Sequence, residues 1–385
     1  MRIAFYAPMK PPDSPVPSGD REMARNLMRA LALAGHEVLL ASRFVSRDGA
    51  GDAGRQARIE EAGAKLADRL VRRVRESGPG FRPDAWFTYH LYHKAPDHLG
   101  PRVADALGIP YVVAEASHAP KQAGGRWDHG YRAAEQALRG AHAVIGLSSL
   151  DAACVTPLLR SPARYRALRP FTDTGLFADA ASKRDAHRAA LARRFGWPED
   201  ATLLLAVGMM RPGDKLASYR ALADALSRLP PTADWRLCVV GDGPARNDVA
   251  AAFAAFPADR IGFAGAAAPD ALPAFYAGAD ILAWPAINEA YGMALLEAQA
   301  AGLPVVAGRA GGVADIVRDG ETGLLSPEGD IAAFASSLAR LLVDSAMREE
   351  MRAASFRTIA SAHGLDAAAA ALDAALHAAR EAAET

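Results

Sequence analysis

Residues 279–312 have the sequence ADILAWPAINEAYGMALLEAQAAGLPVVAGRAGG, and this stretch decides the fold. The apolar run 279–284 predicts a buried strand, which ends at Pro285 because proline has no backbone N–H to give to a sheet. A loop follows, and then a helix that begins near Tyr291. The apolar run 303–307 predicts the next strand. A strand, a helix and another strand in this order indicate one unit of a parallel sheet.

The same alternation of apolar runs and helix-length segments extends along the whole chain. Strands are expected in the first half at 2–7, 36–42, 85–88, 110–114 and 142–147, and in the second half at 202–207, 235–240, 260–263, 279–284 and 303–307. The pattern breaks between Leu168 and Phe177, where we expect a linker. The fold class is therefore α/β, with two doubly wound domains at 1–170 and 171–360. Residues 361–385 are Ala-rich and are expected to form a C-terminal helix.

Composition supports two cores and argues against several classes of protein. Of the 385 residues, 51% are apolar, and a chain of this length usually forms more than one core. The apolar N-terminal run is interrupted by Pro8 and is too short for a signal peptide or a membrane span, so we expect a cytoplasmic protein. Cys154 and Cys238 are far apart and lack metal-ligand spacing, which argues against a disulfide framework and a zinc site.

Charge is distributed unevenly, although the formal net charge is zero. The residues up to Pro170 include 25 basic and 17 acidic side chains, and the later residues include 19 and 27. Residues 55–76 carry seven basic and four acidic side chains. The apolar residues of this segment recur at helical spacing: Ile59, Leu66, Leu70 and Val74. Such a face indicates either a helix packed on the sheet or a peripheral contact with an anionic membrane or lipid phosphate. The basic residues lack interleaved aromatic side chains, which argues against nucleic acid as a partner.

Glu289 and Glu297 are the candidate site residues of the quoted stretch. Eight residues of helix would separate their backbones by about 12 Å. Carboxylates accept hydrogen bonds from adjacent hydroxyls, so the pair suits the two ends of a sugar linked to a nucleotide. The backbone amides of Ala290, Tyr291 and Gly292, near a helix N-terminus, suit an anion between those ends. The alternative is a pair of solvated glutamates on a surface helix.

The segments that follow this pair add further glycines. Gly311-Gly312 is interpreted as a turn open to phosphate, and residues 319–325 as a glycine-rich hairpin. With these flanks, the chain resembles a family 4 retaining glycosyltransferase of the GT-B fold (glycosyl transferases group 1) from Ile3 to about Arg352. The resemblance implies two Rossmann-like domains that face a central cleft, with the C-terminal helix returning to the first domain. It also implies that the first domain binds an acceptor and the second a nucleotide-sugar.

Two further segments carry this resemblance, each with a departure. The family's Gly-Gly turn, which approaches the donor phosphates, appears here as Ser18-Gly19. The family's Gly-Arg-Leu…Lys strand end appears as Gly208-Met209-Met210-Arg211…Lys215. The resemblance implies that Lys215 binds the diphosphate. Met209 stands where the family has arginine, so Arg211 is expected to supply the missing charge.

The resemblance also assigns roles to the remaining candidates. Similar enzymes place a histidine beside the reacting sugar at the end of a first-domain strand, the position of His118, and a loop histidine is the alternative. Glu289 is expected to orient the sugar, Glu297 to bind the ribose, and Gly241 to have a structural or base-facing role. The catalytic set is therefore His118, Glu289, Lys215 and Arg211. The donor-binding set is Gly19, Gly208, Lys215, Gly241, Ala290, Tyr291, Gly292 and Glu297.

The implied donor is a UDP-sugar or a GDP-sugar, and neither a cofactor nor a metal ion is expected. The chain contains no Asp-x-Asp, the motif of metal-dependent transferases of the other common fold, and His90, His93 and His98 fit no familiar zinc pattern. The acceptor is an unidentified glycan, lipid or small molecule, and the basic first half favours an anionic or lipid-linked one.

Three alternatives remain. A glycoside hydrolase would need carboxyl groups about 5 to 9.5 Å apart, which fits the glutamate pair poorly. A sugar-nucleotide epimerase of the same fold and a nucleotide-sugar-binding protein without catalysis fit the same residues.

Overall fold

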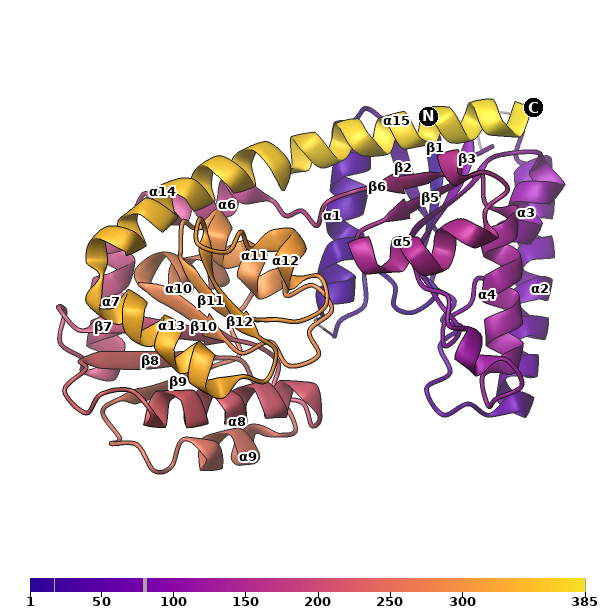
Figure 1. Ribbon diagram of the computed structural model, residues 1–385. Coiled ribbons are helices and arrows are strands. Elements are labelled where there is room, and N and C mark those ends of the chain that lie inside the picture. The colour runs from indigo at the N-terminus through magenta and orange to yellow at the C-terminus, as the bar shows by residue number, and fades with distance from the viewer. Residues whose placement is uncertain (17, 79–81, 385) are drawn as a thin grey trace. The chain divides into compact units, whose positions relative to one another are not determined.

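The computed structural model describes residues 1–16, 18–78 and 82–384, and it divides into two compact units (Figure 1). Unit 1 comprises Met1–Arg169 and the C-terminal residues from Leu365 onward, and unit 2 comprises Pro170–Gly364. The boundaries expected from the sequence were 170/171 and 360/361. The last residue of the expected C-terminal helix, Thr385, lies outside the described residues.

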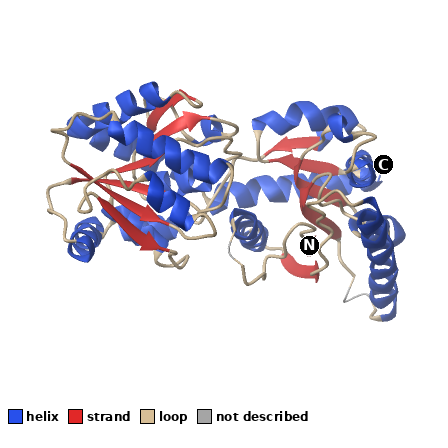
Figure 2. Cartoon of the chain, turned by 90° about the horizontal axis from the view of Figure 1, so that it is seen from below, coloured by secondary structure: helices blue, strands red, loops and turns tan. Residues whose placement is uncertain are grey.

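Unit 1 contains a parallel sheet of six strands in the order β2-β1-β3-β4-β5-β6. Its interior strands are almost entirely buried because helices cover the sheet, which explains their continuous apolar runs (Figure 2). The strands are β1 (Arg2–Tyr6), β2 (Glu37–Ser42), β3 (Ala85–Leu91), β4 (Tyr111–Ala116), β5 (Ala143–Gly146) and β6 (Tyr165–Ala167). The chain order reverses between β1 and β3, so the loops after these strands flank a topological switch point.

The helices of unit 1 form two groups. Helix α15 packs on α1 and reaches β4 and β5, whereas α2 packs on α3 and α4. The main helices are α1 (Gly19–Leu33), α2 (Ala53–Glu76), α3 (Gly100–Leu107), α4 (Asp128–Gly140), α5 (Ser149–Val155) and α15 (Leu365–Glu384). Nε2 of His36 lies 3.1 Å from Oδ1 of Asp373 and ties α15 to this unit. The C-terminal helix therefore returns to the first domain, as expected.

The structure packs the apolar face of α2 against its own unit. Ala67 and Val71 are buried, and the partly buried Leu66, Leu70 and Val74 contact the same hydrophobic cluster. The charged side of this helix remains at the surface. Peripheral membrane contact through α2 stays a prediction, and it now depends on charge alone because the apolar face is occupied. Among the described residues, no helix combines the length and apolar character that crossing a membrane requires.

Unit 2 repeats the architecture with a second parallel sheet, in the order β12-β11-β10-β7-β8-β9. The strands are β7 (Thr202–Val207), β8 (Trp235–Val240), β9 (Ile261–Gly265), β10 (Ile281–Trp284), β11 (Val305–Arg309) and β12 (Gly323–Pro327). The chain order reverses between β10 and β7, which places the switch point of this sheet between them. The hairpin expected at 319–325 was wrong, because β12 pairs parallel to β11 after a tight turn.

The helices of unit 2 are α6 (Thr174–Ala181), α7 (Arg184–Phe195), α8 (Asp214–Ser227), α9 (Arg246–Ala252), α10 (Leu272–Gly278), α11 (Met293–Ala300), α12 (Val313–Ile316), α13 (Ile331–Val343) and α14 (Ser345–Ala362). Helices α6 and α7 precede β7, and the later helices follow strands of the sheet or one another. With both units, the fold is α/β with two doubly wound domains, as the sequence predicted.

Asp280, one residue before β10, holds a partly buried charge network in unit 2. Its carboxylate accepts hydrogen bonds from Arg184 at 2.5 Å, from Arg188 at 2.6 Å and from the Leu203 amide at 2.8 Å. Burial acts to raise the pKa of Asp280, but the Arg188 charge and these hydrogen bonds outweigh burial and lower it. The network therefore fastens α7 to two strands of the sheet.

We expect Asp280→Asn to lower the free energy of unfolding by roughly 3 kcal/mol, because two arginines lose a charged partner. The lowered pKa means that the folded state favours the ionised carboxylate. This stabilisation is present above the pKa of the unfolded chain and disappears as the pH falls through the folded pKa. Urea unfolding of both proteins at neutral and acidic pH measures this. Equal stabilities at neutral pH would contradict the expectation.

Candidate active site

The loop between β10 and α11 has an unusual backbone conformation at the switch point of unit 2. Ala286 and Asn288 adopt positive φ values of 56° and 47°, which non-glycine residues rarely do. The Asn288 amide N–H donates to the Glu328 carboxylate at 2.7 Å, and its side chain donates to Asp214 at 3.0 Å. Neighbouring elements therefore hold the loop in shape. Strained loops of this kind are concentrated at ligand sites.

Glu289 lies in this loop and is paired with Lys215 from the first turn of α8. Nζ of Lys215 lies 2.5 Å from Oε2 of Glu289, and Nε1 of Trp284 donates to the same oxygen at 3.0 Å. The ammonium also lies 5.3 Å from the centre of the Trp284 ring. The structure thus brings together two of the predicted residues and adds a tryptophan at the end of β10. From the sequence, that tryptophan was predicted only to be part of a strand.

Glu297 lies on α11, and a buried tyrosine fixes its carboxylate. The hydroxyl of Tyr276, on α10, donates to Oε2 of Glu297 at 2.7 Å. Burial, and then the charge of Glu297, raises the pKa of Tyr276 well above its usual range, so the phenol keeps its proton. The expected separation of about 12 Å assumed that one helix joins Glu289 and Glu297. That assumption was wrong, because α11 begins at Met293 and Glu289 lies outside it.

Three glycines shape the loop around this pair. Gly292, with φ of 75°, precedes the first turn of α11. At Gly311, a Cβ atom would lie 2.1 Å from the carbonyl oxygen of Glu289, and the Gly312 amide donates to the Ala290 carbonyl at 2.7 Å. The Gly311-Gly312 turn, interpreted from the sequence as open to phosphate, therefore packs against the backbone of the loop.

Gly208 and Gly241 lie at the carboxyl ends of β7 and β8. Gly241 has a φ of 145°, and a Cβ there would lie 1.9 Å from the Gly208 carbonyl oxygen. The Tyr219 hydroxyl donates to that oxygen at 2.7 Å. Only glycine permits this approach of the two strand ends, so the geometry gives Gly241 a structural role.

Arg211 stands apart from the predicted cluster. Its side chain is exposed, and within the described residues no ion pair or hydrogen bond joins its guanidinium to the Glu289 carboxylate. Met209 is partly buried. In this structure, therefore, Lys215 is the cation that pairs with the Glu289 carboxylate.

The first-unit candidates lie at the carboxyl edge of the other sheet. Gly19 begins α1, where the Ser18 hydroxyl accepts the Arg21 amide at 3.2 Å, and nothing lies within 4 Å of the position of a Cβ at Gly19. His118 follows β4, and its Nε2 lies 3.2 Å from the Tyr131 hydroxyl and 3.3 Å from Oε2 of Glu135. The sequence gave no indication of these two partners, which come from α4.

The three other histidines of this edge do not converge. Nδ1 of His90 lies 3.2 Å from Asp20 and 3.5 Å from Glu115. His93 lies near Lys94, whereas His98 lies near Glu60 and His129. Within the part of the chain that the structure describes, no three His, Cys, Asp or Glu side chains are arranged to hold a metal ion.

Comparisons with known proteins place this geometry in a family. Residues 201–344 match the family described as "Glycosyl transferases group 1". A D-inositol 3-phosphate glycosyltransferase of Salinispora arenicola is 31% identical over 67% of this chain and 61% of its own length. A 2-deoxystreptamine glucosyltransferase of Streptomyces kanamyceticus is 31% identical over 66% of this chain and 67% of its own length.

The chain belongs to the glycosyl transferases group 1 family. The solved structure of Anabaena HepE in complex with UDP-glucose has the same fold, with a TM-score of 0.69 and 17% identity over 98% of this chain and 99% of that one. The fold is thus GT-B. The chain spans 43 to 61% of the length of three D-inositol 3-phosphate glycosyltransferases that it matches.

The matched segment contains all the candidate site residues of unit 2. Lys215, Glu289 and Glu297 lie within residues 201–344, together with the missed residues Trp284 and Tyr276. Tyr276 lies 21 positions before Glu297, and no sequence pattern connects its hydroxyl with that carboxylate. Only the packing of the folded chain reveals the contact. Gly19 and His118 lie outside the segment.

Proposed function

We propose that this chain is a retaining glycosyltransferase that moves a sugar from a nucleotide-diphosphate-sugar to an acceptor without a metal ion. The observation that carries the proposal is the Lys215–Glu289 pair, which lies after β7 and β10, the two strands at the switch point of unit 2. Ligands of doubly wound sheets bind at such points, beyond the carboxyl ends of the strands. The family of the chain and the UDP-glucose bound to HepE support a UDP-sugar or GDP-sugar as donor.

In this proposal, the donor diphosphate takes the place of Glu289 beside Lys215. The ammonium then faces the negative charge that develops when the anomeric bond to phosphate breaks. The released Glu289 carboxylate accepts hydrogen bonds from hydroxyls of the sugar, while Trp284 continues to orient it. Backbone amides near Gly292 and the Gly19 turn add further donors for the phosphates. In the proposed mechanism, Lys215 has the role that a metal ion has in metal-dependent transferases.

Glu297 is proposed to bind the ribose hydroxyls, with Tyr276 holding the carboxylate in place. The sugar's anomeric carbon loses its bond to the phosphate oxygen and gains one to an acceptor hydroxyl on the same face. The proton of that hydroxyl passes to the leaving diphosphate. Unit 1 is proposed to bind the acceptor, with His118 beside the reacting sugar.

Product analysis with and without acceptor separates the candidate activities. The full chain is incubated with UDP-glucose, GDP-mannose and other nucleotide-sugars, alone and with a panel of glycan, lipid and small-molecule acceptors. A glycosyltransferase releases the nucleoside diphosphate and a new glycoside of the donor's anomeric configuration, and it does so with EDTA present. Donor isomerisation without acceptor would establish an epimerase instead. Donor binding without any product would establish a binding protein.

Replacing Gly19 with alanine tests the proposed approach to the donor phosphates. The free protein has room for the extra methyl group, so we expect an unchanged melting temperature. A phosphate packed against the Gly19 backbone would meet this methyl group. The donor KM should therefore rise by roughly tenfold, which corresponds to about 1.4 kcal/mol. Steady-state kinetics measures it, with Gly140→Ala as a control because that glycine is equally open and lies at the end of α4. A donor KM that stays the same would remove Gly19 from the site.

A further inference from the structure

His118 is held on two sides by residues of helix α4. The Tyr131 ring stacks on the imidazole, with 5.2 Å between ring centres and 28° between planes. Oε2 of Glu135 lies 3.3 Å from Nε2 of His118, close enough for a hydrogen bond or an ion pair. The imidazole side chain is only 9% exposed. A ring held by both stacking and a carboxylate has one strongly favoured orientation.

The partners of Nε2 decide which ring nitrogen carries the proton. Hydrogen bonds from Arg139 and then from Tyr131 lower the pKa of Glu135 to about 2, so this carboxylate stays ionised and only accepts hydrogen bonds. The Tyr131 hydroxyl lies 3.2 Å from Nε2, and its oxygen can accept a hydrogen bond from that nitrogen. The carboxylate can only accept a hydrogen bond at Nε2, whereas the hydroxyl can either accept or donate there. In the neutral imidazole, the Glu135 carboxylate 3.3 Å from Nε2 therefore favours a proton on Nε2 and a lone pair on Nδ1.

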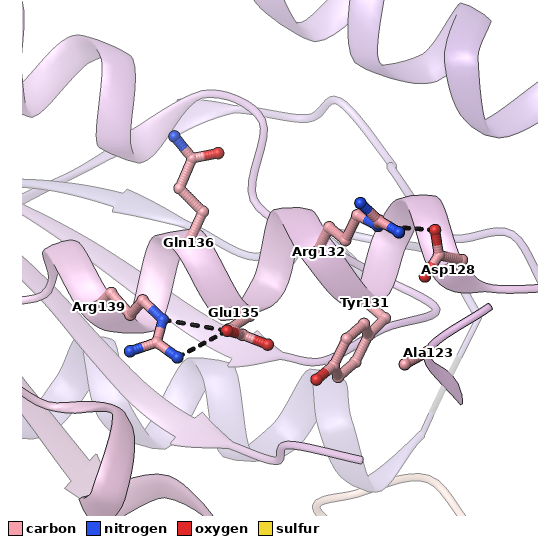
Figure 3. Close-up of a pocket in the computed structure, with 7 residues that line it drawn as sticks. All are labelled: Ala123, Asp128, Tyr131, Arg132, Glu135, Gln136 and Arg139. Carbon is pink, nitrogen blue, oxygen red and sulfur yellow. Dashed lines mark hydrogen bonds and ion pairs between the residues drawn. The ribbon is translucent and has the colours of Figure 1, made fainter. Parts of the chain in front are cut away.

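Glu135 is itself fixed by a bidentate donor. Nε and Nη2 of Arg139, one helical turn later, donate to its Oε1 at 3.0 and 2.7 Å. Figure 3 shows the carboxylate between the Arg139 guanidinium and the Tyr131 ring. All three side chains line a hollow of about 360 Å³. Oε1 accepts hydrogen bonds from Arg139, and Oε2 contacts Nε2 of His118. The two carboxylate oxygens thus have separate tasks, which surface ion pairs of helices do not require.

We infer that Glu135 is a positioning residue that holds His118 as the Nε2–H tautomer, so that Nδ1 accepts a hydrogen bond from a hydroxyl of the reacting sugar. The inference rests on the proposed function, because it assumes that His118 lies beside that sugar. A histidine in the other tautomer would present an N–H donor at Nδ1, and a sugar hydroxyl would then lose its acceptor. The same relation of a carboxylate to an imidazole sets the tautomer in many enzyme sites.

The first test is spectroscopic and requires no substrate. Long-range ¹H–¹⁵N spectra of the full chain labelled with ¹⁵N-histidine report the tautomer of each ring at mildly alkaline pH, and the spectrum of His118→Asn identifies the signal. We expect the Nε2–H tautomer in the wild type and a mixture or the Nδ1–H tautomer in Glu135→Gln. Asp128→Asn is the matched control, because it breaks a similar ion pair with Arg132 on the same helix. It should leave the His118 signal unchanged.

The second test is kinetic. Glu135→Gln should lower kcat by roughly tenfold, the effect of losing one well-placed hydrogen bond of about 1.4 kcal/mol. The donor KM should change little, and Glu135→Asp should restore part of kcat and of the Nε2–H signal. A melting temperature within a few degrees of the wild type shows that the variants fold. Asp128→Asn should retain wild-type kcat.

The outcomes separate this inference from the proposed function. An Nδ1–H tautomer in the wild type, or one that Glu135→Gln leaves unchanged, would overturn the inference. A full kcat in Glu135→Gln, when His118→Asn is inactive, would also overturn it while leaving the role of His118 intact. A full kcat in His118→Asn would instead overturn the role proposed for His118 in transfer, and the inference would fall with it.

Discussion

Lys215→Ala should lower kcat for sugar transfer by about 10²- to 10³-fold, the loss expected when a cation that faces developing charge is removed. The physical reason is that Lys215, which pairs with Glu289, faces the diphosphate in the proposed site, whereas the exposed Arg211 does not pair with this carboxylate. The measurement is nucleoside diphosphate release under saturating donor and acceptor. Folding is not expected to suffer, because the lysine is partly exposed and its partner keeps the Trp284 hydrogen bond.

Two companion variants make this result specific. Lys183→Ala removes another lysine of unit 2 that forms an exposed ion pair with Asp179, and it should leave kcat unchanged. Arg211→Ala should have a smaller effect than Lys215→Ala if Lys215 alone carries the charge. If both variants lose the same activity, Arg211 moves into the site when the donor binds. Wild-type kcat in Lys215→Ala would show that the lysine has no part in transfer.

Glu297→Gln should raise the donor KM by roughly tenfold to a hundredfold while kcat changes little. Glutamine keeps the volume and can still accept the Tyr276 hydroxyl, so the substitution isolates the charge of the carboxylate. Hydrogen bonds to a charged group contribute about 1.5 to 3 kcal/mol, and each 1.4 kcal/mol is a factor of ten. In the proposed site Glu297 binds the ribose, which is remote from the bond that breaks, so the effect is expected on the donor KM.

The same measurement on Tyr276→Phe tests how the carboxylate is held. Removing the hydroxyl leaves the ring in its buried place and takes one hydrogen bond from the Glu297 carboxylate, so the donor KM should rise by less than in Glu297→Gln. Competition by the free nucleoside diphosphate should weaken in parallel in both variants. A fall in kcat with an unchanged donor KM would place Glu297 at the reacting sugar rather than at the ribose.

The fold could be predicted from the sequence because its signals are local. Continuous apolar runs such as 279–284 mark strands buried on both faces, and their alternation with helical segments indicates a parallel sheet. The error at 319–325 has the same origin. A glycine-rich turn before an apolar run is compatible with a hairpin or with a parallel strand, and only pairing with β11 decides between them.

The site could be predicted only in part. Glu289, Glu297 and Lys215 were selected through motifs, but their partners come from long-range packing. The Lys215–Glu289 pair joins residues 74 positions apart, and the Tyr276–Glu297 pair joins residues 21 apart. Glu135, which contacts His118, lies on α4 among several other charged residues. No sequence pattern distinguishes this contact from the Asp128–Arg132 pair beside it.

Binding of a nucleoside diphosphate to unit 2 is the central claim, and thermal unfolding of the full chain with UDP, GDP and ADP tests it most directly. At a ligand concentration a hundred times its dissociation constant, the folded state gains about 2.7 kcal/mol. We predict that UDP or GDP raises the melting temperature of the wild type, and that the rise is absent in Lys215→Ala and reduced in Glu297→Gln. No rise with any nucleotide, or an equal rise in all three proteins, would contradict the account.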